Sequence, residues 1–159
     1  MIKLPFGVEI NDLIDNLRSL SWEAADILLY YANIIKKLEQ KNEILKNKNN
    51  DDPVTLADLE VNELIINRIN QTYQDTNWEI LSEENFKIQS NYFNNVDWLW
   101  VLDPLDGTKD FIQGTQNYAM HLALNYKQRP YIGIVLIPAK EELWISYEEK
   151  IWCEDREGN

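Results

Sequence analysis

The sequence predicts an α+β fold in which N-terminal helices pack on a mostly antiparallel sheet. Apolar residues between positions 10 and 38 recur at spacings of three and four, which is typical of amphipathic helix. From Trp78 onward the apolar residues gather instead in short runs separated by turn signals, which is typical of strands. Helices followed by several strands favour an α+β layer arrangement. The chain has 159 residues and no linker rich in Pro and Gly, so residues 1–159 are predicted to form a single domain.

Two helices are expected before the strands. The first is predicted over Ile10–Lys41, and a break near Leu20–Ser21 that would divide it is left open. Pro53 is expected to stop any helix and to set up an extended Val54–Thr55. The second helix is predicted over Leu56–Tyr73, with Thr55 as its N-cap. The buried side of this helix is expected to contain Leu59, Leu64, Ile65 and Ile69.

Six short strands and one short helix are expected in the second part of the chain. The strands are predicted over Trp78–Leu81, Trp98–Leu102, Ala119–Asn125, Tyr131–Ile137, Leu143–Tyr147 and Ile151–Cys153. A short helix is expected to open at Thr108. His121 lies in an alternating strand and is expected to be a packed or hydrogen-bonded strand residue rather than a catalytic base.

Composition and charge exclude several classes of protein. Hydrophobic residues make up 45% of the chain and charged residues 26%, so a globular protein rather than a disordered one is expected. The net charge of −12 makes nucleic acid and anionic membranes poor partners. Small phosphorylated substrates remain compatible, because a bound divalent cation can invert the local field.

The cellular setting is predicted to be cytoplasmic. Cys153 is the single cysteine of the sequence, so no disulfide can form within the chain, which fits a reducing compartment. The N-terminal residues contain no long apolar run typical of a signal peptide, and no apolar segment has the length of a membrane span.

The segment DPLDGT, residues 103–108, carries the strongest chemical signal. It follows an apolar strand, so Asp103 is expected at a strand end with Asp106 turned back beside it. The Leu105 carbonyl adds a third oxygen, and such hard donors suit Mg²⁺. Gly107 permits a close backbone approach, and the helix that opens at Thr108 offers N–H groups to a phosphate. The alternative is a simple strand–turn–helix junction with Asp as a turn residue.

Two further segments could add to this site. The segment LSEE, residues 81–84, ends another predicted strand, and adjacent strand ends would bring Glu83 to the same crevice. Alone, this acidic pair would be an ordinary solvated loop. The segment DPVTLAD, residues 52–58, feeds a helix, where Asp58 could instead only interact favourably with the helix dipole.

The segments DPVTLAD, LSEE and DPLDGTKDF occur in the order and approximate spacing of the inositol monophosphatase superfamily, which the chain resembles. The fold implied is the first half of the inositol monophosphatase-like (sugar phosphatase) fold. Lys109 and the acidic Asp110 resemble the 3′(2′),5′-bisphosphate nucleotidase branch, the CysQ type, which is associated with sulfur assimilation. The resemblance implies a Mg²⁺-dependent, lithium-sensitive phosphomonoesterase that hydrolyses the 3′(2′)-phosphates of nucleotides such as 3′-phosphoadenosine 5′-phosphate.

The same resemblance implies a role for each site residue. Glu83, Asp103 and the Leu105 carbonyl would be metal ligands, and Asp106 would be a ligand of a second cation. Asp58 and Thr108 would orient and deprotonate the attacking water. The backbone N–H groups of Gly107 and Thr108 would hold the substrate phosphate. Lys48 lies where this branch often has a lysine.

The resemblance also has a gap. The family carries a second domain with a Trp-Asp-x-Ala-Ala motif, and no Trp-Asp pair follows Thr108 in this sequence. The chain is therefore expected to be the N-terminal half of a phosphatase, with impaired activity when isolated. A homodimer, or a chain that carries the missing half, is the expected partner. The alternatives are an inositol-phosphate or sugar-bisphosphate phosphatase, and a catalytically silent metal-binding module that needs a partner chain.

Overall fold

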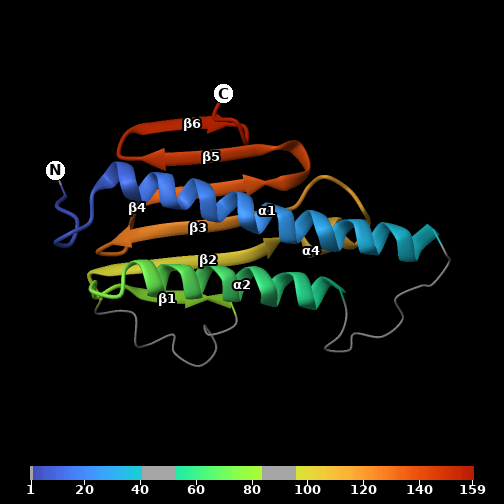
Figure 1. Ribbon diagram of the computed structural model, residues 1–159, viewed down its shortest axis with the longest axis horizontal. Helices are drawn as coiled ribbons and strands as arrows, with labels where there is room; N and C mark the ends of the chain where they lie inside the picture. The colour runs from blue at the N-terminus through green and yellow to red at the C-terminus, as the bar shows by residue number, and fades with distance from the viewer. Residues whose placement is uncertain (1, 41–52, 84–95) are drawn as a thin grey trace.

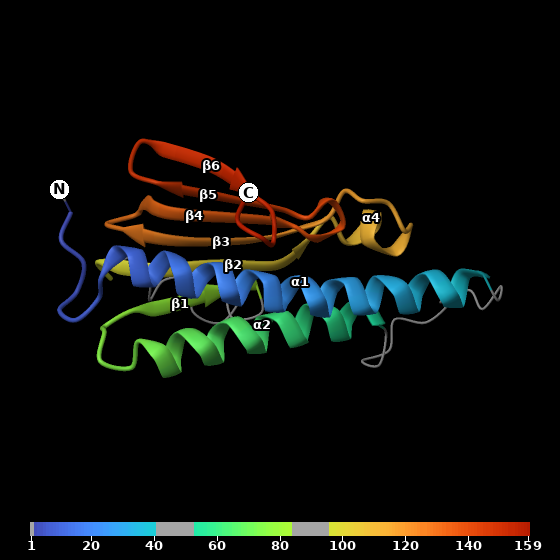
Figure 2. The ribbon, with the colours of Figure 1, turned by 45° about the horizontal axis from the view of Figure 1, so that its top comes forward.

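The computed structural model describes residues 2–40, 53–83 and 96–159 and shows two layers (Figure 1). Two long helices, α1 (Ile10–Gln40) and α2 (Pro53–Thr72), lie side by side on one face of a sheet, as Figure 2 shows from a second direction. Shorter helical segments among the described residues include α4 (Thr108–Ile112) and the 3₁₀ segment η2 (Pro138–Lys140). The arrangement confirms the predicted α+β class.

In the described parts of the chain, the sheet has six strands in sequential order from β1 to β6. β1 and β2 are parallel, and every later neighbouring pair is antiparallel, so the predicted mostly antiparallel sheet is confirmed. The strands are β1 (Glu79–Ser82), β2 (Trp98–Asp106), β3 (Ala119–Tyr126), β4 (Arg129–Ile137), β5 (Glu142–Tyr147) and β6 (Lys150–Glu154).

The helices settle one open point in α1 and correct two predictions at the start of α2. α1 runs without interruption through Leu20 and Ser21, which are both buried. α2 begins at Pro53, so the expected extended Val54–Thr55 and the Thr55 N-cap are wrong. A proline fits the first turn of a helix, because its missing N–H would have no partner within the helix there.

Burial in α2 also differs from the expectation at one residue. Leu59 is exposed, whereas the buried stripe follows a four-residue spacing. The stripe consists of Ala57, Val61, Ile65 and Ile69.

The core lies between the helices and the sheet. Alternate strand residues, including Trp100, Leu122 and Ile134, are almost fully buried, as expected for a strand face packed on helices. Their neighbours His121 and Val135 are only partly buried. The two faces of the sheet therefore differ, and the second face carries the residues that flank the candidate site.

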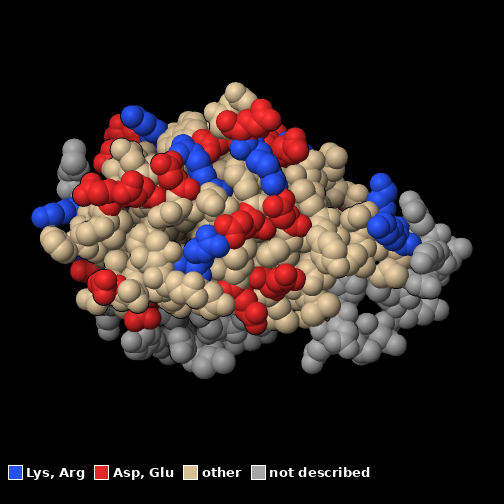
Figure 3. All heavy atoms as spheres, viewed as in Figure 1, with Lys and Arg blue, Asp and Glu red and all other residues tan. Residues whose placement is uncertain are grey.

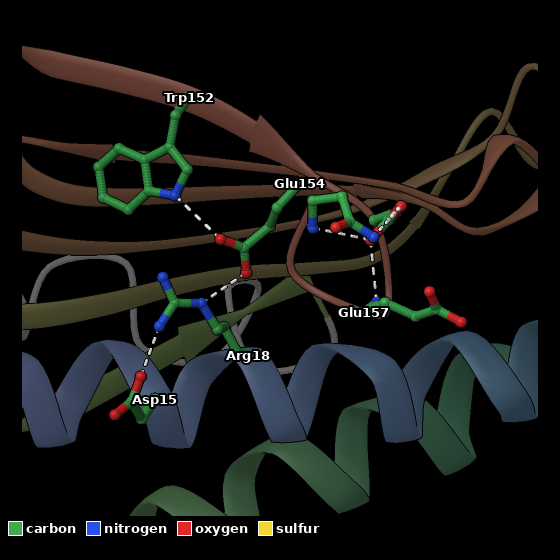
Figure 4. Close-up of polar contacts among 7 residues, drawn as sticks. Asp15, Arg18, Trp152, Glu154 and Glu157 are labelled. Atoms are coloured by element: carbon green, nitrogen blue, oxygen red, sulfur yellow. Dashed lines mark hydrogen bonds and ion pairs between the residues drawn. The ribbon is translucent and has the colours of Figure 1, made fainter.

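Two ion pairs connect α1 to the C-terminal part of the chain. Arg18 Nε donates to Glu154 Oε1 at 2.5 Å, and Arg18 also pairs with Asp15 on its own helix (Figure 4). Glu154 is buried, and its second oxygen accepts a hydrogen bond from Trp152 Nε1 at 3.1 Å. The second pair, between Arg156 and Asp26, is exposed.

The junction between β2 and α4 requires a glycine. Gly107 precedes α4 with φ 79° and ψ 36°, the left-handed region. A Cβ atom at this position would lie 2.6 Å from the backbone oxygen of Asn117. Position 107 therefore excludes a side chain both by backbone conformation and by space.

Acidic side chains are spread over the face of the molecule that carries the helices, and basic side chains form small separate groups among them (Figure 3). This distribution agrees with the net charge of −12. In the parts of the chain that the structure describes, no helix is both long and apolar enough to cross a bilayer.

We expect Glu154→Gln to destabilise the fold more than Asp26→Asn. The first change disturbs a buried, charge-assisted pair of hydrogen bonds, which costs about 1.5–3 kcal/mol. The second weakens an exposed ion pair, which contributes about 0–1 kcal/mol. Urea unfolding of the two variants beside the wild-type chain measures both costs, and equal costs would contradict the structural role given to Glu154.

We expect Gly107→Ala to cost about 2–5 kcal/mol of unfolding free energy, because a left-handed conformation and a backbone clash add together. Gly7→Ala is the matched control, since Gly7 has φ 83° and open space around its Cα. The control should cost no more than about 1–2 kcal/mol. Thermal and urea unfolding compare the two, and a control cost as large as that at position 107 would exclude the clash as the cause.

Candidate active site

The parallel pairing of β1 and β2 brings two acidic residues together. Ser82, the last residue of β1, pairs with Leu102. The next residues along the two strands are Glu83 and Asp103, and both line one open hollow of about 470 Å³. Glu83 is exposed and Asp103 is partly buried. The sequence-based expectation that these two carboxylates share a crevice agrees with this placement.

The rest of the DPLDGT segment lines the same hollow. Leu105, Asp106, Gly107 and Thr108 are all part of its wall. Asp103 was expected at the end of its strand, but β2 continues to Asp106. The pairing of β2 with β3 is irregular between these two positions, so the strand bends where the acidic residues occur.

Hydrogen bonds within the segment hold its polar groups. Asp103 Oδ1 accepts a hydrogen bond from the Leu105 N–H at 3.2 Å, and Asp106 Oδ1 accepts one from the Gly107 N–H at 2.9 Å. The Thr108 hydroxyl donates to the Leu105 carbonyl at 3.3 Å. The Gly107 N–H expected to hold a phosphate is therefore already bonded to a carboxylate of its own turn.

The electrostatics of the hollow favour a cation. Burial raises the pKa of the Asp103 carboxyl above its ordinary value, and the negative charges of Asp106 and Glu83 raise it further. The Leu105 N–H and His121 act in the opposite direction. A carboxylate surrounded by like charge is stabilised by a bound cation, because the cation removes the repulsion.

The donor set suits a hard divalent ion. Carboxylate and carbonyl oxygens are the ligands that Mg²⁺ prefers, and this ion usually retains several waters beside one or two carboxylates. In the described residues, no three His, Cys, Asp or Glu side chains are close enough together to form a preformed metal cage. The chemistry of these oxygens therefore suits Mg²⁺, with water needed for the remaining coordination positions.

Other predicted site residues lie apart from the hollow or outside the described residues. Asp58 is partly buried in α2, and it is not among the described residues that line the hollow. Its helix does contact α4 and β2, which carry the DPLDGT segment. Lys48, Asp52 and Glu84 fall outside the described residues.

The structure adds one polar residue near the site that the sequence analysis treated as structural. His121 on β3 pairs directly with Asp103 on β2. Both residues line a second hollow of about 400 Å³, which shares Asp103 with the first. Alternation along the strand predicts that His121 lies on the other face of the sheet from Met120 and Leu122. Only the register between β2 and β3 shows that it lies beside Asp103.

Comparison with curated proteins gives consistent relatives. The 3′(2′),5′-bisphosphate nucleotidase CysQ of Salmonella typhimurium is 26% identical over 146 residues, which are 90% of this chain and 55% of that protein. The bifunctional phosphatase IMPL2, chloroplastic, of Arabidopsis thaliana is 31% identical over 119 residues, 70% of this chain and 31% of that protein. The chain thus spans between 31% and 55% of the length of these two relatives.

Solved structures and a family model agree with these relatives. The CysQ of Bacteroides thetaiotaomicron, described as a bacterial member of the inositol monophosphatase family, superposes with a TM-score of 0.62 at 27% identity, over 83% of this chain and 45% of that one. A model described as "Inositol monophosphatase family" matches residues 10–155. From this match and from the shared fold, the chain belongs to the inositol monophosphatase family.

Proposed function

We propose that the chain carries the Mg²⁺ and phosphate site of a phosphomonoesterase. The observation that supports this most is the placement of Glu83, Asp103, Asp106 and the Leu105 carbonyl around one hollow beside Gly107 and Thr108. Members of the family are phosphatases that generally depend on Mg²⁺. In such a site Mg²⁺ supplies charge neutralisation and lowers the pKa of water for attack on phosphorus.

The metal ligands in this proposal are Glu83, Asp103 and the Leu105 carbonyl, with Asp106 directed to a second cation. Asp58 and Thr108 orient and deprotonate the attacking water. Asp106 would leave the Gly107 N–H when it turns toward a cation, and that N–H would become available to the substrate phosphate together with the Thr108 N–H. Ligand closure and phosphate binding would then assist each other.

The second cation has one proposed ligand in the described residues, Asp106. A further carboxylate from outside these residues, in a second copy or in another chain, would complete it. Removing one such electrostatic contact from a transition state typically costs about 10²–10³ in rate. We therefore infer that the isolated chain binds one Mg²⁺ and turns over slowly.

The substrate class we propose is the nucleotide with a 3′(2′)-phosphate, such as 3′-phosphoadenosine 5′-phosphate. The CysQ relatives are named as 3′(2′),5′-bisphosphate nucleotidases, which supports this class. The name of the matched family keeps inositol phosphates as the second candidate. A sugar bisphosphate completes the set of substrates that the test needs.

We expect phosphate release from 3′-phosphoadenosine 5′-phosphate to require both Mg²⁺ and Asp103. The measurement is inorganic phosphate formed by the 159-residue chain with Mg²⁺ or EDTA, with inositol monophosphate and fructose 1,6-bisphosphate as parallel substrates. Asp103→Asn should reduce the rate by about 10²-fold or more. A rate per molecule that rises with chain concentration would indicate that a second copy supplies the missing ligand.

Two outcomes would contradict this proposal. Preferential hydrolysis of inositol monophosphate would exclude the nucleotide as the preferred substrate. Mg²⁺ binding without release from any of the three substrates would instead support a catalytically silent metal-binding module.

We expect Asp103→Asn to have opposite effects on thermal stability with and without Mg²⁺. In EDTA at pH 7 the variant should melt at a higher temperature than the wild type, because it removes a carboxylate that burial and like charges disfavour. With Mg²⁺ in excess the wild type should gain stability and the variant should not. Differential scanning calorimetry measures both differences, and an equal Mg²⁺ effect on the two chains would exclude Asp103 as a ligand.

The stability difference in EDTA should also depend on pH. The pKa of Asp103 is raised in the folded chain, so the folded state holds this proton more tightly than the unfolded state. The contribution of Asp103 to the unfolding free energy of the wild type therefore falls as the pH rises from the ordinary carboxyl pKa through the raised pKa of the folded chain. The advantage of Asp103→Asn should be present above this window and absent below it, and calorimetry from pH 3 to pH 8 is the check. An advantage that is independent of pH would contradict this origin.

A further inference from the structure

His121 is the single histidine of the sequence and lies directly across the sheet from Asp103. Paired residues on neighbouring antiparallel strands have Cβ atoms about 4.5–5.5 Å apart on the same face. An imidazole on one strand therefore reaches a carboxylate on the other. Both side chains line the same hollow of about 400 Å³.

The surroundings leave Asp103 as the natural partner of this imidazole. The other neighbours of His121 on this face are apolar, with Ala123 along its own strand and Val135 paired with it on β4. Among the described residues that line the hollow, Asp103 and His121 are the only ionisable side chains. No competing charge from this hollow draws the imidazole away from Asp103.

The carboxylate of Asp103 can accept a second hydrogen bond. In the described part of the chain, the hydrogen bond from the Leu105 N–H to Oδ1 is the one that the Asp103 side chain accepts. Carboxylates that bind metals are usually held by further hydrogen bonds, which fix their orientation. Asp103 lines both hollows, so a donor on the His121 side would fix one carboxylate oxygen and leave the other for the Glu83 side.

We propose that His121 is a positioning residue, which donates a ring N–H to Oδ2 of Asp103 and thereby orients this carboxylate for a divalent cation. The proposal rests on the proposed function, because it takes Asp103 as a cation ligand. His121 does not touch the cation or the substrate in this account. Its effect is on the geometry and affinity of the site.

The test is Mg²⁺ binding to the full chain by isothermal titration calorimetry. His121→Leu removes the donor and should weaken Mg²⁺ binding about 10–100-fold, the usual loss for a residue that orients a ligand. His121→Asn places an amide N–H in a similar position and should restore most of the affinity. Ser146→Ala, a loss of a polar group in the same hollow but on β5, is the matched control and should bind as the wild type does.

A second measurement does not depend on the leucine variant folding. The lone imidazole gives one set of ¹⁵N signals, which should shift on addition of Mg²⁺ with the same dissociation constant as the calorimetry. In the metal-free chain these signals should differ between the wild type and Asp103→Asn, because the proposed hydrogen bond ends on that carboxylate.

The outcomes separate this inference from the proposed function. The role of His121 alone would be overturned if the wild type binds Mg²⁺ and His121→Leu binds it with the same affinity. It would also be overturned if the imidazole signals do not respond to Asp103→Asn. A wild-type chain that does not bind Mg²⁺ would overturn the metal site itself, and the positioning role with it.

Discussion

The parallel pairing of β1 with β2 is the constraint on which the candidate site depends. The last paired residues of the two strands are Ser82 and Leu102. The residues that follow them, Glu83 and Asp103, therefore line one hollow. A shift of one residue would send one of the two carboxylates to the opposite face of the sheet. The helix layer holds this register through the buried residues of β2, above all Trp100, which is fully buried.

The same arrangement stores an electrostatic cost. Asp103 is partly buried beside two other acidic residues, and burial and like charge both raise its pKa. A fold selected only for stability would place an apolar or neutral group at position 103, since a partly buried carboxylate beside like charges opposes folding. In the proposed function, the same carboxylates would attract a divalent cation, and the bound cation would remove the repulsion between them.

Local signals predicted most of the fold and part of the site. Short apolar or alternating runs between turn signals located the six strands, and the turn residues of DPLDGT located the junction before α4, because both are encoded in neighbouring residues. Pro53 was misread because a proline both stops a helix and starts one, and only packing of α2 decides between them. The proximity of His121 to Asp103 could not be predicted from the sequence, because it depends on the register between β2 and β3, which no local pattern encodes.

The central claim is that a divalent cation binds between Glu83, Asp103 and the Leu105 carbonyl. The most direct measurement is anomalous diffraction from crystals of the chain soaked with Mn²⁺, a hard cation with the same preference for oxygen ligands. The account predicts an anomalous peak about 2.0–2.6 Å from an oxygen of Asp103 and from the Leu105 carbonyl. A peak elsewhere on the molecule, or no peak in a crystal where this hollow is open to solvent, would contradict it.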